Sequence, residues 1–293
     1  MLRWAVMVVL TGLLATPLAA RQGSWQVRVR EGAIQPGDVL RVEVTPPATA
    51  SSVAGTWQTR AVPFVAEGPV WTALIGIDVD AAPGTEVLRL TSVPIHGVAA
   101  SFDASITIVP KAVRTRRLRV NPKFVNPPRA MLPRIGRETA LLNAAFAETS
   151  PNRLWRGGAV RPVEGVAVSG FGVRSVLNGQ PRGPHNGLDL AAGTGTPVYA
   201  PTPGVVVFAR EFYYSGNTVI LDHGQGLFST MAHLSVIDVK EQQQVAQGDL
   251  LGKVGATGRV TGPHLHWAVR LHGARVDPLS LLQALATASR RVP

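Results

Sequence analysis

Short runs of alternating hydrophobic and polar residues dominate the first third of the chain. Runs at 26–29 and 39–44 have the period-2 pattern of half-buried strands, and further β-rich runs follow at 71–79, 86–91 and 105–109. Turn residues separate them, as in Pro36-Gly37-Asp38. Strands at this spacing predict an immunoglobulin-like β-sandwich over residues 21–110. No His, Asp or Glu cluster with catalytic spacing occurs in this range, so we expect a structural or binding module.

Residues 111–154 have a different composition, in which arginine and lysine alternate with proline. This composition predicts a basic, proline-stiffened linker. A short helix is expected at 138–148, with Leu142 and Phe146 four residues apart on one face, and Pro151 stops it. The linker and its helix could also lie across a groove in the domain that follows and keep that domain latent.

From residue 155 onward the pattern is again β-rich, with more glycine. Strands are expected at 160–168, 196–200, 204–209, 217–222, 227–233, 250–254 and 264–271. The connections between them are turn-like, which predicts an antiparallel, hairpin-built domain over residues 155–286 and a tail at 287–293. The fold class is therefore all-β, with a short linker helix between the two β domains.

The first twenty residues resemble a secretory signal peptide, with Arg3 followed by an apolar run and a break at Pro17. An uncleaved anchor is the alternative, but the apolar run is shorter than the roughly 20 residues of a membrane helix. No later segment could span a bilayer, so we expect an exported protein of the periplasm or outer envelope, with a monomer as the default.

Composition narrows the choice of partners. The 293-residue chain has no cysteine, which excludes disulfides and thiolate zinc sites. Its formal charge is +11, with 29 Lys and Arg against 18 Asp and Glu, and this balance favours an anionic partner. Because the chain carries an export signal, anionic envelope polymers are expected rather than nucleic acid. A charge that serves only solubility is the alternative.

The strongest chemical signal is the stretch Gly262-Pro263-His264-Leu265-His266-Trp267. In a strand, residues i and i+2 project to the same side, so His264 and His266 are expected to face one site while Leu265 and Trp267 face the other way. Two imidazoles on one face of a plain core would each need hydrogen-bond partners, so a functional site is favoured.

Two weaker signals accompany this pair. His185 and Asp189, separated by three residues, are both ordinary zinc ligands, and Pro184 and Gly187 place them on a loop that enters a strand rather than on a helix. His233 ends a predicted strand and by itself indicates nothing.

In order and spacing, several stretches are similar to one known family. They are Ser169–Arg174, His185–Ala192, Gly195–Ala200, Gly216–Ile220, His233–Ser235, Gly255–Gly258 and Thr261–Trp267. Through them residues 155–282 resemble the lysostaphin/LytM-type peptidoglycan endopeptidases.

The resemblance implies a β-sheet peptidase domain with an open groove and one zinc ion per chain. The zinc ligands would be His185, Asp189 and His266, and the catalytic histidines would be His233 and His264. Three protein ligands leave the fourth zinc position open for water, as in catalytic sites. One catalytic histidine would then move the proton and the other would support the oxyanion. The implied substrate is the peptide part of peptidoglycan. His223, His96 and His272 match no catalytic position and are expected to be structural or surface residues.

Two positions depart from the family pattern. Some members place a tyrosine a few residues before the first ligand to stabilise the tetrahedral intermediate, whereas residues 178–184 contain none. Oxyanion support would then come from zinc and a histidine, or from Asn178 or Arg182, the substrate-binding candidates there. Met231 stands where an aromatic residue often occurs, which puts specificity in question. Some relatives have lost the metal ligands and act only as binding partners of wall hydrolases, but here the ligand set is complete.

Overall fold

The computed structural model describes residues 4–7, 24–30, 32–148 and 150–286. These fall into two compact units, the first within 1–36, 40–75 and 81–110 and the second within 37–39, 76–80 and 111–293. The expected tail and most of the expected signal segment lie outside the described residues. Within the described part of the chain, no helix has the length and apolar character needed to cross a membrane.

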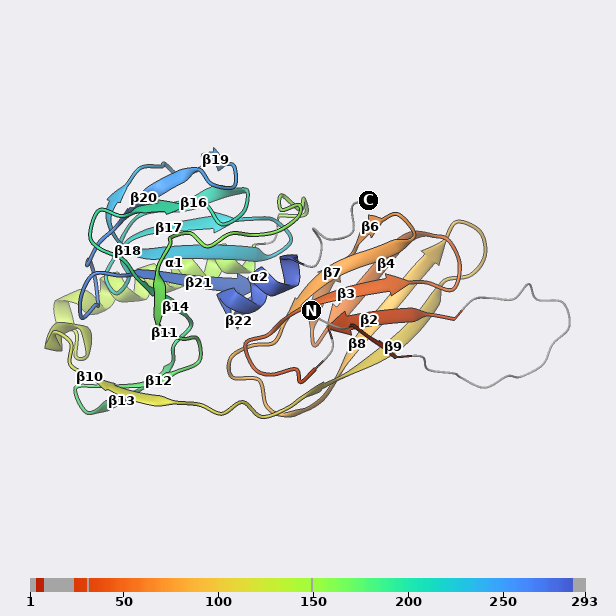
Figure 1. Cartoon of the computed structure of the whole chain (residues 1–293), viewed down its shortest axis with the longest axis horizontal. Coiled ribbons are helices and arrows are strands. Elements are labelled where there is room, and N and C mark those ends of the chain that lie inside the picture. Colours follow the sequence, from red (N-terminus) through yellow and green to blue (C-terminus); the bar gives the residue numbers. More distant parts are fainter. Residues whose placement is uncertain (1–3, 8–23, 31, 149, 287–293) are drawn as a thin grey trace, which may run out of the picture. The chain divides into compact units, whose positions relative to one another are not determined.

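The first unit consists of two antiparallel sheets (Figure 1). The five-stranded sheet has the order β1-β2-β3-β7-β6 and contains β1 (Trp4–Met7), β2 (Gln26–Arg30), β3 (Val39–Thr45), β6 (Val65–Glu67) and β7 (Val70–Gly76). The four-stranded sheet has the order β5-β4-β8-β9 and contains β4 (Ala50–Trp57), β5 (Arg60–Pro63), β8 (Gly84–Pro94) and β9 (Ala100–Ile108). Alternate residues of β8 are buried, as expected when one face of a sheet packs on a core.

This unit confirms the β-rich expectation and adds strands that the pattern missed. β4, β5 and β6 were not expected, because their small and polar residues give no clear alternation. β1 pairs antiparallel with β2 and lies inside the expected signal segment, whose export role stays a prediction. The likeness to an immunoglobulin domain also stays a prediction.

The second unit is built on a ten-stranded sheet whose main path is β11-β14-β21-β18-β17-β16-β19. The strands on this path are β11 (Val166–Ser169), β14 (Gly187–Ala191), β21 (Leu265–Leu271), β18 (Leu227–Ile237), β17 (Gly216–Asp222), β16 (Gly204–Phe212) and β19 (Gln244–Val245). Three more strands attach to it: β15 (Pro197–Tyr199), β20 (Leu250–Val254) and β22 (Ala274–Val276). The expected all-β fold is therefore confirmed. Leu188 of β14, Met231 of β18 and Trp267 of β21 are fully buried.

The expected linker contributes to the second unit rather than only connecting to it. β10 (Thr115–Leu118) pairs in parallel with β12 (Arg174–Leu177), and β13 (Gln180–Pro184) completes a three-stranded sheet. Short 3-10 turns follow at Pro122–Phe124 and Arg129–Met131. The run of arginines over β10 reads as a charge run in the sequence, so no strand was expected there.

Helix α1 (Leu132–Ala147) begins six residues before the expected start at 138. Pro133 lies in its first turn, where the missing N–H costs nothing, so proline here opens the helix instead of excluding it. The expected apolar face is confirmed: Leu142 and Phe146 pack against a cluster on the sheet formed by Phe208, Phe212, Ile220 and Phe228. A second helix, α2 (Pro278–Ala286), ends the described chain.

Candidate metal centre and active site

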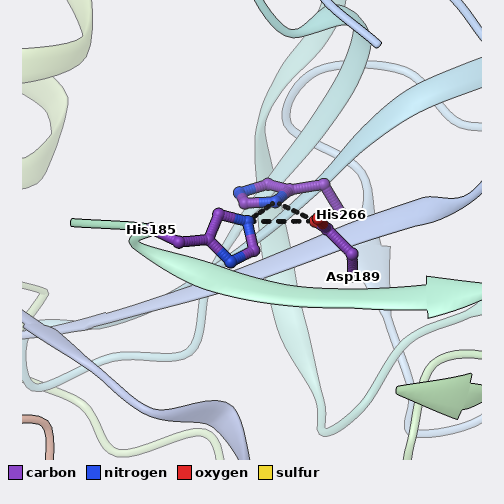
Figure 2. Close-up of side chains that lie close together, drawn as sticks. All are labelled: His185, Asp189 and His266. Carbon is purple, nitrogen blue, oxygen red and sulfur yellow. Dashed lines mark hydrogen bonds and ion pairs between the residues drawn. The ribbon is translucent and has the colours of Figure 1, made fainter. Parts of the chain in front are cut away.

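Three of the expected site residues meet where β14 and β21 lie side by side (Figure 2). Asp189 and His266 are direct cross-strand partners, and His185 lies just before β14. The Asp189 Oδ1 atom is 2.9 Å from His266 Nδ1 and 3.0 Å from His185 Nε2, and the two imidazole nitrogens are 3.1 Å apart. The ligand atoms of all three residues lie within 4.8 Å of one another, so the group could hold a metal ion.

The local chain explains why the two histidines can approach so closely. The Nδ1 atom of His185 is 3.0 Å from the Gly170 carbonyl oxygen, which can only accept, so this nitrogen carries the hydrogen. The other ring nitrogen, Nε2, faces Asp189. Gly187 lies beneath the His266 ring, and a Cβ atom there would come 2.7 Å from His266 Cε1, so any side chain would displace the ligand.

The other two expected residues, His233 and His264, lie beside this cluster. The ring centroids of His233 and His264 are 5.0 Å apart, and those of His233 and His266 are 5.8 Å apart. His264 Nε2 lies 3.7 Å from Asp189 Oδ1. The structure therefore brings all five histidine and aspartate residues of the expected site together.

Both of these histidines are held in the same tautomer. His233 Nδ1 lies 2.9 Å from the Thr257 carbonyl oxygen, and His264 Nδ1 lies 2.8 Å from the Gly262 carbonyl oxygen. Since a carbonyl accepts, each Nδ1 carries the hydrogen and each Nε2 is left with a free lone pair. His233 has a positive φ of 67°, a strained conformation for a non-glycine residue of the kind found at functional sites.

The ionisation of these groups follows from burial and from their neighbours. Burial alone would raise the pKa of the Asp189 carboxyl, but the imidazoles of His185 and His266 outweigh it and hold that pKa well below its ordinary value. Burial, followed by the charges of His266 and His264, lowers the pKa of His233 to about 3. Burial also lowers the pKa of His266. The low pKa keeps Asp189 a carboxylate, and the lowered pKa values of His233 and His266 favour their neutral imidazoles; a carboxylate and neutral imidazoles are the forms that bind a metal.

The donor set fits zinc. Two imidazole nitrogens and one carboxylate oxygen are typical zinc ligands, and tetrahedral bonds of about 2.1 Å would separate neighbouring ligand atoms by about 3.4 Å. The observed separations of 2.9, 3.0 and 3.1 Å need to open by only a few tenths of an ångström. Converging lone pairs also need a cation between them, either a proton or a metal ion.

The cluster opens into a cavity of about 640 Å³. Besides the five site residues, parts of the expected linker line it, namely Arg116, Leu118, Val120, Leu142 and Phe146. Arg116 Nη2 lies 3.5 Å from Asp189 Oδ2, the oxygen that faces away from the histidines. The linker thus lines the cavity, as the hypothesis that it keeps the domain latent requires. Latency itself stays a prediction.

The structure places the two substrate-binding candidates differently. Asn178 uses its side chain to bond both the backbone N–H and the carbonyl of Val120, at 3.0 and 2.9 Å. Arg182 lines the cavity, and its Nη2 donates to the Val125 carbonyl and to Gln180 Oε1. A substrate role for either residue stays a prediction.

Asn178 also has a structural task. Asn178 and Gly179 have φ values of 50° and 84°, which form the tight hairpin between β12 and β13. This Asn-Gly dipeptide is the sequence signal that would have predicted the hairpin.

The remaining histidines lie apart from the cavity lining. His223 is fully buried, with Nδ1 2.7 Å from the Pro203 carbonyl oxygen. His272 and Gly273 form the hairpin between β21 and β22, with φ values of 48° and 76°. Neither they nor His96 are among the described residues that line the cavity.

Comparison with known proteins finds one match to part of the second unit and one to most of the chain. The model of Peptidase family M23 matches residues 183–278. A crystal structure described as a peptidase M23 from Pseudomonas aeruginosa is 35% identical, covers 85% of this chain and 95% of that one, and superposes with a TM-score of 0.66. The chain belongs to peptidase family M23.

Two named relatives each match about a third of this chain. Peptidoglycan DD-endopeptidase ShyA of Vibrio cholerae is 47% identical over 96 residues, which cover 33% of this chain and 22% of that protein. DD-carboxypeptidase/endopeptidase Mpg of Neisseria meningitidis is 43% identical over 97 residues, again 33% of this chain and 22% of the relative. The matched stretch thus spans about a fifth of each of these relatives.

Proposed function

We propose that the protein is an exported zinc metalloendopeptidase that hydrolyses cross-links or stem peptides of bacterial peptidoglycan. The observation that carries the proposal is the convergence of His185, Asp189 and His266 on one point, with two further histidines beside it whose Nε2 lone pairs are free. Membership of family M23 and the names of the relatives ShyA and Mpg support the substrate class.

The chain's own residues divide the work as follows. His185 Nε2, His266 Nδ1 and Asp189 Oδ1 would hold one zinc ion, which would supply a Lewis acid to activate water and polarise a carbonyl. His233 and His264 line the same cavity beside this group. One of them accepts the proton of the attacking water at Nε2 and returns it to the leaving amine, and the other supports the developing oxyanion.

The rest of the chain positions this site on the cell wall. Residues 1–20 direct export, residues 21–110 form a β module, and the basic residues of 111–154 connect it to the peptidase domain at 155–286. The formal charge of +11 favours anionic envelope polymers in addition to peptidoglycan. Nucleic acid is not a partner in this proposal, and a monomer is sufficient for it.

The test combines metal analysis with release of peptides from isolated peptidoglycan. We expect about one zinc per wild-type chain and soluble peptides whose termini identify the bond. Asp189→Ala should lose both zinc and cleavage, whereas His264→Ala should keep zinc and lose cleavage. His96→Ala, which replaces a histidine outside the cavity lining, is the matched control and should behave as wild type.

The outcomes separate the alternatives. A folded wild-type protein that retains no zinc but binds wall sacculi would replace the enzyme by a binding module. A protein that holds zinc but cleaves neither wall nor synthetic wall peptides would contradict the proposed activity. Cleavage that survives in His264→Ala would contradict the role of that histidine.

A further inference from the structure

The cavity that holds the metal-site residues is strongly cationic. Its charged lining, among the described residues, is one carboxylate and five arginines: Asp189, Arg116, Arg182, Arg259, Arg270 and Arg275. Arg116 is placed against Asp189, and Arg275 is paired with Asp78 and Asp80 of the same unit. Arg270 lies over the Phe146 ring, 4.6 Å from its centroid, and its Nη1 donates to the Gly273 carbonyl. Arg182 and Arg259 remain to be explained.

Arg259 is a half-buried guanidinium without an anionic partner. Its Cζ lies 4.9 Å from the ring centroid of Tyr214, and within the described part of the chain its side chain makes no hydrogen bond or ion pair. Burial lowers the pKa of Arg259, the interaction with Tyr214 partly offsets this, and the nearby charge of Arg182 lowers the pKa further. A partly desolvated charge that no described residue neutralises costs stability, and a ligand with a negative charge would offset that cost.

Arg182 lines the same cavity and has unused donors. Its two hydrogen bonds, to Val125 and to Gln180, both come from Nη2. Its guanidinium has no carboxylate partner among the residues that the structure describes. Two arginines thus line one cavity, and neither has a counter-charge among the residues that the structure describes.

The backbone fixes Arg259 close to the active histidines. The backbone N–H of Arg259 donates to the Tyr214 carbonyl at 2.8 Å. The carbonyl of the next residue, Ser215, accepts from the backbone N–H of His233 at 2.9 Å. A Cβ atom on Gly258 would come 2.6 Å from the Tyr214 carbonyl oxygen, so glycine is required for this approach. The segments that hold Arg259 and His233 are therefore packed against each other.

We propose that Arg259, assisted by Arg182, binds a carboxylate of the peptide substrate, so that the enzyme selects peptides with a free carboxylate near the scissile bond. This inference rests on the proposed peptidase function and names the substrate feature that the function leaves open. A guanidinium presents paired N–H donors that match the two oxygens of a carboxylate, and the Tyr214 ring holds its plane in place.

Two sources could supply the carboxylate. One is the C-terminal α-carboxylate of the peptide, which would make the enzyme act at chain ends. The other is the side-chain carboxylate of an acidic residue or a diamino acid inside the peptide, which would make it act within cross-links. The same arginine contact serves both, so peptides must distinguish them.

The experiment uses the zinc-loaded full chain and pairs of wall-type peptides that differ only in one carboxylate. In one pair the C-terminal carboxylate is free or amidated, and in the other the side-chain carboxylate is free or amidated. The preference is the ratio of kcat/KM for the free and amidated forms. We expect the wild type to prefer the free form of one pair about 10- to 100-fold, because hydrogen bonds to a charged group contribute about 1.5–3 kcal/mol and 1.4 kcal/mol is tenfold.

Variants assign the preference to the arginine. Arg259→Gln should reduce the ratio towards one, and Arg259→Lys, which keeps the charge but not the fork of donors, should keep part of it. Arg210→Gln is the matched control, since Arg210 is paired with Glu241 outside the cavity, and its ratio should equal that of wild type. Zinc content is measured for each variant to show that the metal site is intact.

A binding measurement separates this inference from the proposed function. Calorimetry of the same peptides on the His264→Ala protein, with and without Arg259→Gln, needs no turnover. If binding shows the carboxylate preference but the wild type cleaves nothing, the peptidase proposal fails and the subsite stands. A wild type that cleaves and binds both forms equally, or an Arg259→Gln protein with an unchanged preference, would overturn the inference.

Discussion

Substituting Gly216 by alanine tests how tightly the two segments beside the active histidines are packed. Gly216 has a φ of 63°, and a Cβ atom there would lie 2.6 Å from the Thr257 carbonyl oxygen, against the backbone of that residue. The left-handed conformation costs alanine about 1–2 kcal/mol. Overlap with backbone that cannot move aside adds about 1–3 kcal/mol. We therefore expect Gly216→Ala to lower the free energy of unfolding of the second unit by about 2–5 kcal/mol, the sum of these two ranges.

Gly248→Ala provides the matched control. Gly248 also has a positive φ, 85°, but a Cβ atom there would meet nothing within 4 Å. Its substitution should cost only the backbone part, about 1–2 kcal/mol. Hydrogen exchange of the β17 and β18 amides measures the unfolding free energy of the second unit without contributions from the first.

The same substitution has a functional consequence, because Thr257 is the residue whose carbonyl accepts the His233 Nδ1–H. Displacing that carbonyl misplaces the imidazole, and a shift approaching 1 Å costs about 10²-fold in rate. We expect kcat/KM to fall about 10- to 100-fold in Gly216→Ala and less than about twofold in Gly248→Ala. Equal losses of stability in the two variants, or full activity in Gly216→Ala, would refute the reasoning.

Three further predictions concern pH, the helix and the metal. Burial lowers the pKa of His223 from 6.5 to about 4, so the unfolded chain binds the proton more tightly than the folded chain. The free energy of unfolding should therefore fall by about 3 kcal/mol as the pH drops from about 6.5 to about 4. Urea unfolding of His223→Gln should show a correspondingly smaller pH dependence. Phe146→Ala should destabilise the second unit by about 2–4 kcal/mol because its ring packs edge-on against Phe228, whereas Leu141→Ala on the exposed face of α1 should change the melting temperature little. Zinc at about 100 times its Kd should raise the free energy of unfolding of the wild type by about 2.7 kcal/mol and leave that of Asp189→Ala unchanged. Equal increases in both proteins would place the ion elsewhere.

Local patterns in the sequence were sufficient for part of this picture. The i, i+2 spacing of His264 and His266 predicted that both face one site, and the full burial of Leu265 and Trp267 on the other side of β21 confirms that alternation. The short β-rich runs likewise predicted an all-β chain. These features depend only on the two-residue repeat of a strand, which can be read without knowing its neighbours.

Local patterns were insufficient wherever partners come from distant segments. Nothing near Arg116 in the sequence indicates that it reaches Asp189, because that contact depends on the parallel pairing of β10 with β12. Basic residues interspersed with proline are typical of a linker, and only packing against the sheet shows that this segment also forms a strand and a longer helix.

The sequence by itself determined the chemical groups of the site and the faces on which neighbouring groups lie. Only the tertiary structure decided the cross-strand register that sets Asp189 opposite His266, 77 residues away, and the partial burial of Arg259 where no described residue supplies a counter-charge. The physical reason is that side-chain direction is a property of a few bonded residues. Register, burial and electrostatic environment are instead set by the many non-local contacts of the packed sheet.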